Sequence, residues 1–198
     1  MTMLGKKTLP PNNLKELIPY LKANREKLSY GNAGLGAASH LCGLMFMSQN
    51  EIDLTTVPYK GTAPAMTDLI GGQTQLMFEN IATGLPYIKA KRIRALGVTS
   101  LKRMPSLPDV PPISESGVPG YEAAPWYTIS VASGVPNDIV RKLNADLEKV
   151  LRMPEVLTRW NELGVTVVGG STEAAVKKNQ MEAERWTKVI KAAGIRAE

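Results

Sequence analysis

Apolar and polar positions alternate along the first hundred residues in a way that predicts strands and helices in turn. Short runs with apolar and β-branched residues predict four strands, at 27–31, 52–59, 75–80 and 93–100. Segments with apolar residues at helical spacing lie between them and predict helices at 37–48, 62–72 and 81–91. Because each connection is about ten residues long, we expect parallel neighbours in a doubly wound α/β sheet.

The flanking segments follow a different pattern. Asn13 is expected to cap a helix that Pro19 kinks or shortens. Residues 104–120 carry five prolines and predict a stiff connection between layers or domains. Beyond them the pattern predicts several amphipathic helices but only two short strands, at 125–133 and 165–170. A complete second α/β domain would need more sheet, so we expect this chain to be truncated at its front.

Three loops are expected at the carboxyl ends of the first three strands, where doubly wound sheets bind ligands: 30–37, 58–62 and 79–83. The first contains Gly31, Gly34 and Gly36 in a spacing that is neither GxGxxG nor a P-loop. A carboxylate pocket fits better than a nucleotide site. The predicted ligand-binding residues here are Asn32, Ala33, Gly34, Gly36 and Ala37, and the donors would be the unpaired amides of residues 33–37 together with Ser39 or His40. The alternative is that the glycines only permit a positive φ in a tight turn.

The other two loops offer polar groups as well. Lys60 and Gly61 could form a second face of the pocket, with Thr62 capping the next helix, or they could belong to an ordinary turn. Glu79 could receive an ammonium or hydroxyl group of a ligand, and Asn80 could donate to a carboxylate. The alternative for Asn80 is a helix cap.

Composition and charge exclude several classes of protein. The chain has 198 residues, 43% of them hydrophobic and 21% charged, which is typical of a soluble globular protein. One cysteine and one histidine argue against a disulfide and against a metal site, and no motif indicates a cofactor. No secretory signal is visible, so the protein is either cytosolic or begins downstream of a removed signal.

The net charge of +6 is uneven: the first hundred residues hold 11 Lys and Arg against 6 Asp and Glu. This excess favours an anionic ligand. Nucleic acid is not expected as a partner, because the cations are scattered and aromatic residues are few. An enzyme that uses His40 remains an alternative, although the chain lacks a GxSxG elbow and a nearby partner for this histidine.

The segments YGNAGLGAASHL, VPYKGTAPAMTDLIGGQTQLMFEN, IRALGVTS and LPDVPPISESGVPGYEA resemble the Bug family, the TctC-like receptors of tripartite tricarboxylate transporters. The resemblance implies a type II periplasmic binding protein, not an enzyme, whose two α/β domains close on a small carboxylate or amino acid. It implies ligand contacts at Ala33–Ala37, His40, Glu79 and Asn80. Relatives often carry Ser or Thr in place of Ala37, and Asp in place of Glu79.

On this resemblance, residues 5–121 form the complete second domain and 122–198 the C-terminal segment of the first, whose N-terminal half is absent. The implied partners are a carboxylate ligand and the membrane components of the transporter, in the periplasm. A homodimer through the incomplete first domain is possible. The alternative is a fragment that binds no ligand and only folds or oligomerises.

Overall fold

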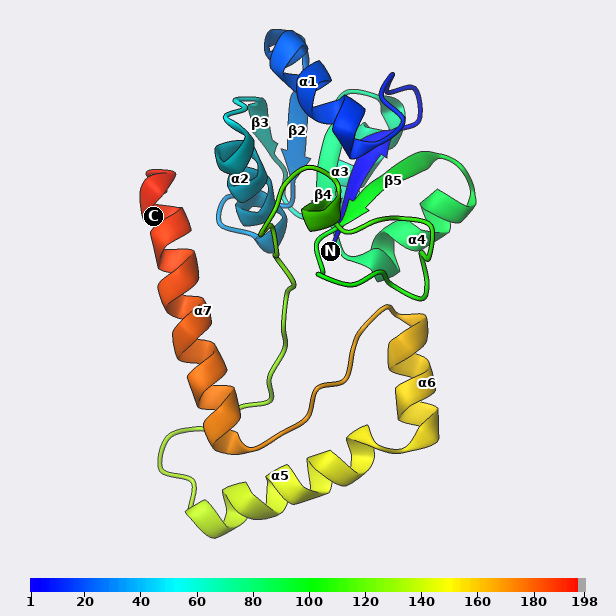
Figure 1. Cartoon of the computed structure of the whole chain (residues 1–198). Coiled ribbons are helices and arrows are strands. Elements are labelled where there is room, and N and C mark those ends of the chain that lie inside the picture. The colour runs from blue at the N-terminus through cyan, green and yellow to red at the C-terminus, as the bar shows by residue number, and fades with distance from the viewer. Residues whose placement is uncertain (196–198) are drawn as a thin grey trace. The chain divides into compact units, whose positions relative to one another are not determined.

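The computed structural model describes residues 1–195 and divides into two compact units (Figure 1). Unit 1 contains Met1–Pro125 and the described residues from Val189 onward, and unit 2 contains Trp126–Lys188. Each unit is described by itself below.

Unit 1 is built on one five-stranded sheet in the order β3-β2-β4-β1-β5. Strand β2 pairs in parallel with β3 and β4, whereas β1 runs antiparallel to both β4 and β5. The strands are β1 (Thr2–Lys6), β2 (Ser29–Asn32), β3 (Thr55–Pro58), β4 (Leu76–Glu79) and β5 (Ile93–Val98). The four strands predicted within the first hundred residues are confirmed as β2, β3, β4 and β5.

The prediction of a fully parallel sheet is wrong, because the sheet contains one antiparallel strand, β1, that the sequence pattern did not reveal. This strand has only five residues, TMLGK, and a pair of prolines at positions 10 and 11 follows it after three residues. It lies between β4 and β5, with Leu4 opposite Met77 on one side and Ala95 on the other. The sheet is therefore mixed, and β1 is one of its interior strands.

Four α-helices of unit 1 accompany the sheet: α1 (Leu14–Asn24), α2 (Ala38–Asn50), α3 (Thr62–Gly71) and α4 (Ile81–Lys89). Asn13 caps α1 as predicted, because its side-chain oxygen accepts the backbone N–H of Glu16 at 3.0 Å. The helix continues through Pro19 to Asn24 and then tightens into a 3₁₀ turn, η1 (Arg25–Lys27).

Helices cover both faces of the sheet. On one face Leu4, Met77 and Ile93 pack with the α3 residues Met66 and Leu69. On the other face Phe78 meets the rings of Tyr30, Phe46 and Tyr121, with ring centroids 6.1–6.2 Å apart. Burial on both sides explains why the central strands read as continuous apolar runs.

The proline-rich connection closes over the second face instead of leaving the unit. It contains one 3₁₀ turn, η2 (Ile113–Glu115), and Ile113 is fully buried. The hydroxyl of Tyr121 donates to the carbonyl of Cys42 at 2.9 Å, and the amide of Ala123 donates to the carbonyl of Thr99 at 3.1 Å. The connection is therefore part of the core of unit 1 up to Ala123.

Unit 2 carries α5 (Asn137–Leu151), α6 (Pro154–Glu162) and most of α7 (Thr172–Ala192), up to Lys188. Pro154 opens α6, and Ser171 caps α7 by accepting the amide of Ala174 at 3.2 Å. The two strands predicted at 125–133 and 165–170 do not form. A strand needs a hydrogen-bonding partner, and the described chain offers none to either segment, so Ile129 and Val168 remain 76% and 90% exposed.

None of the helices in residues 1–195 is both long and apolar enough to cross a bilayer.

Candidate functional site at the carboxyl edge of the sheet

The three loops that the sequence placed at one edge of the sheet are joined by hydrogen bonds. The amide of Tyr59 donates to the carbonyl of Asn32 at 3.0 Å, and that of Gly61 to Ala33 at 3.2 Å. The hydroxyl of Thr62 donates to the Glu79 carboxylate at 2.8 Å. Because β2, β3 and β4 are parallel, their carboxyl ends meet and bring these loops together.

The glycine loop uses most of its own amides internally, and this corrects one expectation. Ala33 N–H donates to Ser39 Oγ at 3.0 Å, Gly34 N–H to Asn32 Oδ1 at 2.9 Å, and Gly36 N–H to His40 Nδ1 at 3.1 Å. Ala37 N–H donates to the carbonyl of Gly34 at 3.1 Å. These four groups were expected to be unpaired donors. They are occupied because the polar side chains on either side fold back onto the loop.

The alternative interpretation of the glycines as turn residues is confirmed at two positions. Gly34 and Gly36 have φ values of 126° and 73°, which side-chain-bearing residues rarely adopt. At Gly34 an added Cβ would also lie 3.3 Å from the carbonyl oxygen of Tyr59. The glycines therefore permit both the turn and the close approach of the neighbouring loop.

The open donors lie one turn further along, at the start of α2. The first intrahelical bond of this region runs from Leu41 N–H to the carbonyl of Ala37, at 3.0 Å. The N-cap Ala37 supplies no side-chain acceptor, and within residues 1–195 no acceptor is bonded to the N–H groups of Ala38, Ser39 and His40. Unpaired amides at a helix N-terminus carry partial positive charge and favour an anion.

The surroundings of His40 favour its neutral form and fix one tautomer of the ring. The side chain is buried, and burial lowers its pKa because the charged form is desolvated. Since Nδ1 accepts the amide of Gly36, the proton of the neutral ring resides on Nε2. His40 is thus a neutral hydrogen-bond donor through Nε2, without a carboxylate to activate it as a general base.

Asn32 ends β2 and is fully buried. Its oxygen accepts the amide of Gly34, whereas its Nδ2 group has no hydrogen-bond partner among the described residues. A buried amide group without an acceptor is uncommon in folded proteins.

Glu79 forms the other side of this edge. The carboxylate is buried, and its two oxygens accept from Thr62 Oγ1 at 2.8 Å and from the amide of Asn80 at 2.7 Å. Thr62 was expected to cap α3, but the N-cap is Gly61, with φ 112°, and the hydroxyl binds Glu79 instead. Asn80 does occupy the N-cap position of α4, although its side chain makes no cap hydrogen bond. Lys60 is exposed at the rim.

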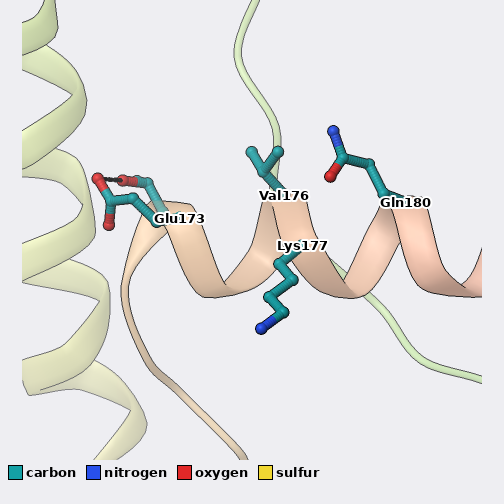
Figure 2. A pocket seen from close by; sticks show the side chains of 5 residues that line it. Glu173, Val176, Lys177 and Gln180 are labelled. Atoms are coloured by element: carbon teal, nitrogen blue, oxygen red, sulfur yellow. Dashed lines mark hydrogen bonds between the residues drawn. The ribbon is translucent and has the colours of Figure 1, made fainter.

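Two hollows on the surface lie away from these residues. One, of about 540 Å³, is lined only by the first turns of α7. Figure 2 shows Val176 and Gln180 on one side of this helix and Lys177 on the other, so the side chains do not converge on a ligand. The second, of about 450 Å³, lies beside Lys6 and Lys91 in unit 1. In the described part of the chain, no group of three or more His, Cys, Asp or Glu side chains could hold a metal ion.

Comparisons with known proteins identify a family and several relatives of this chain. Residues 1–195 match the family model "Tripartite tricarboxylate transporter family receptor". A UPF0065 protein of Pseudomonas sp. is 38% identical over 183 residues, covering 90% of this chain and 54% of the relative. A UPF0065 protein of Agrobacterium vitis is 38% identical over 197 residues, with 98% and 57% covered. The chain thus spans about half the length of these relatives.

Several solved structures are also similar to this chain. An R. palustris protein with adipate superposes with a TM-score of 0.89 at 36% identity, covering 98% of this chain and 65% of that one. The periplasmic binding protein BugD gives 0.86 at 40%, covering 100% and 67%. MatC from Rhodopseudomonas palustris with bound malate gives 0.77 at 30%, covering 96% and 65%.

The sheet order of unit 1, with one antiparallel strand among parallel ones and loops gathered at the carboxyl edge, defines a type II periplasmic-binding-protein fold. The related proteins of known structure are described as a periplasmic binding protein and a periplasmic transporter, not as enzymes. The chain belongs to the tripartite tricarboxylate transporter receptor family, the TctC or Bug family, as its sequence indicated.

Proposed function

We propose that this chain carries the ligand-binding lobe of a periplasmic receptor that binds a small organic carboxylate and delivers it to a tripartite tricarboxylate transporter. Residues 5–121 would be the complete second domain, and 122–198 the C-terminal segment of the first. The observation that carries the proposal is the start of α2, where three unpaired amides lie beside a neutral histidine that donates from Nε2.

This set of donors suits a carboxylate. A carboxylate accepts hydrogen bonds only and is stabilised at a helix N-terminus. Lys60 is the sole cation among the residues predicted for the site, and it is exposed, so the amide groups would provide the main attraction. The bound adipate and malate of two related structures are both dicarboxylates, which supports the same ligand class here.

The buried carboxylate of Glu79 further limits the class of ligand that the site could accept. It would repel a carboxylate placed against it and would accept a hydroxyl or ammonium group. We therefore expect the end of the ligand nearest Glu79 to be uncharged, hydroxylated or amino-substituted. Hydroxylated di- and tricarboxylates and acidic amino acids meet this requirement, while the amides of α2 hold the carboxylate at the other end.

Isothermal titration calorimetry tests the proposal. The ligands are adipate, malate, citrate, aspartate and glutamate, each titrated into the 198-residue chain and into a form extended by the part of the relatives that it does not match. His40→Phe should weaken binding at least about tenfold, because one donor is lost and the loop loses an acceptor. Gln49→Ala, on an exposed position of the same helix, is the matched control. Absence of heat with every ligand in both forms would refute the proposal.

A second function is favoured by the surface of unit 2. Its helices and extended segments expose large apolar side chains, among them Tyr127, Leu143 and Val150, at 73%, 43% and 46%. Apolar faces of this kind mark sites of association. On this alternative the chain binds no ligand and forms a homodimer through unit 2.

Light scattering at several concentrations separates the two. The alternative predicts a dimer that Leu143→Glu combined with Val150→Glu converts to monomer, together with the absence of ligand heat. A monomeric chain that binds a carboxylate excludes it.

A further inference from the structure

We propose that the basic cavity at the opposite edge of the sheet is a docking site for an acidic segment of a protein partner. The basic cavity is the hollow of about 450 Å³ in unit 1 whose lining includes Lys6, Lys7, Lys91 and Arg92. It lies at the amino ends of β4 and β5, since Gly5 pairs with Leu76 and Lys6 with Ile93. The candidate carboxylate site lies at the carboxyl end of β4, so the two sites occupy opposite edges of one sheet.

The four cations of the basic cavity have no acidic partner among the described residues. No acidic residue lines it, and none of its four cations forms an ion pair within residues 1–195. These side chains account for 4 of the 11 cations in the first hundred residues. The basic cavity therefore gathers four cations, whereas Lys60 is the only cation among the residues predicted for the carboxylate site.

Backbone geometry supports a role for one of these side chains. Lys91 has φ 53°, in the left-handed region that disfavours residues with a Cβ. Glycine is the usual residue at this position after a helix, and Gly72, which ends the neighbouring helix α3, has φ 81°. A lysine at such a position keeps a cation on the rim of the cavity at a cost in backbone energy.

The backbone around the cavity favours a peptide over a phosphate or a lipid headgroup. Both helices that end here, α3 and α4, present their C-termini, and the described chain supplies no donor to the carbonyls of Ile70, Gly71 and Ala90. Inorganic phosphate or a phosphodiester would also be attracted to the cations, but it brings no N–H donor for these carbonyls. An acidic peptide brings carboxylates for the lysines and arginine, and backbone N–H groups for the open carbonyls.

Fluorescence anisotropy tests the docking site without reference to the carboxylate site. The probe is a labelled peptide of about twelve residues, half of them Asp or Glu among Gly and Ser; its partner peptide carries Asn and Gln instead. The acidic peptide should bind the intact chain at low salt, and replacement of Lys6, Lys7, Lys91 and Arg92 by Gln should weaken binding about tenfold or more.

A charge-matched variant decides whether the cavity or the net charge is responsible. It replaces Lys22, Arg25, Lys27 and Lys102, which are exposed elsewhere on unit 1, by Gln. This variant should bind the peptide within about twofold of the intact chain. The milder pair Lys7→Gln and Arg92→Gln, both exposed, should show an intermediate loss and guards against misfolding of the quadruple variant.

Three results would overturn the proposal: equal losses in both quadruple variants, equal binding of the Asn and Gln peptide, or binding only to inorganic pyrophosphate or to vesicles with phosphatidylglycerol. Because calorimetry with dicarboxylates reports on the other edge of the sheet, failure here leaves the proposed function standing, and the converse also holds.

Discussion

The backbone N–H of Gly36 donates to Nδ1 of His40 across 3.1 Å, so the glycine loop and the first turn of α2 fix each other. The contact places the ring proton on Nε2 and the loop in its left-handed turn at the same time. The loop thus orients its histidine while its own amides are already hydrogen-bonded, so the open donors lie in the helix that follows it.

Loss of the His40 acceptor is expected to lower stability as well as affinity. His40→Ala leaves the Gly36 amide without its partner and opens space in a buried position, so the free energy of unfolding should fall by about 1–3 kcal/mol. Urea denaturation measures this. His40→Gln retains an acceptor and should recover part of the loss. If the two variants were equally destabilised, the hydrogen bond to Gly36 would have no measurable weight.

The pH dependence of stability should contain a component from His40. Its pKa is lowered from the ordinary value of 6.5 by burial, so the unfolded chain binds a proton more readily than the folded one. Stability from this residue is complete above pH 6.5 and declines as the pH falls below that value. Between pH 5 and 7 the curve for His40→Gln should be flatter than that of the intact chain. NMR of the single histidine gives the pKa directly, and a value above 6.5 in the folded protein contradicts the sign.

The local pattern of apolar and polar residues was sufficient to predict most helices and strands of unit 1. The helical stretches at α2, α3 and α4, the cap at Asn13 and four strands each depend on residues within one element, so their periodicity predicted them. The fifth strand did not follow from pattern. Residues Thr2–Lys6 become a central strand only because β4 and β5, more than seventy residues away, leave a gap that they fill.

The candidate site likewise has features that the sequence could predict and features that it could not. Which loops meet could be predicted, because parallel strands bring their carboxyl ends together. Which amides are open could not, since the answer depends on side chains that fold back: Ser39 and His40 occupy two amides of the loop, and Asn32 a third. Thr62 was likewise predicted to cap a helix, but its hydroxyl binds Glu79 because that buried carboxylate lies within hydrogen-bonding distance.

The hydrogen bond between Thr62 and Glu79 should couple β4 to α3. Glu79→Gln places an amide group against one of two donors, and we expect a loss of about 1–3 kcal/mol. Thr62→Val alone should cost about 1 kcal/mol, and the double variant less than the sum, with a coupling of at least about 0.5 kcal/mol. A urea-denaturation cycle measures the coupling. Thr67→Val, which alters an exposed hydroxyl of the same helix, is the control, and additive losses would show that the pair acts independently.

Gly43 is required by the ring of Tyr30. A Cβ at this position of α2 would overlap the ring carbons and hydroxyl of Tyr30, which is itself fixed by a hydrogen bond to the carbonyl of Ser39. Replacement of a helical glycine by alanine usually gains about 1 kcal/mol, whereas overpacking a core costs about 1–3 kcal/mol or more. Since Tyr30 is buried and cannot move aside, the second effect should win, and Gly43→Ala should destabilise the protein.

The matched comparison is Gly71→Ala at the end of α3, where an added Cβ meets no atom within 4 Å. This variant should be neutral or stabilised by up to about 1 kcal/mol in thermal and urea denaturation. Adding Tyr30→Leu to Gly43→Ala should restore part of the loss, because the smaller side chain vacates the space that the new methyl group needs. If Gly43→Ala proved as stable as Gly71→Ala, the tight contact between α2 and β2 that positions Ser39 and His40 would not exist in solution.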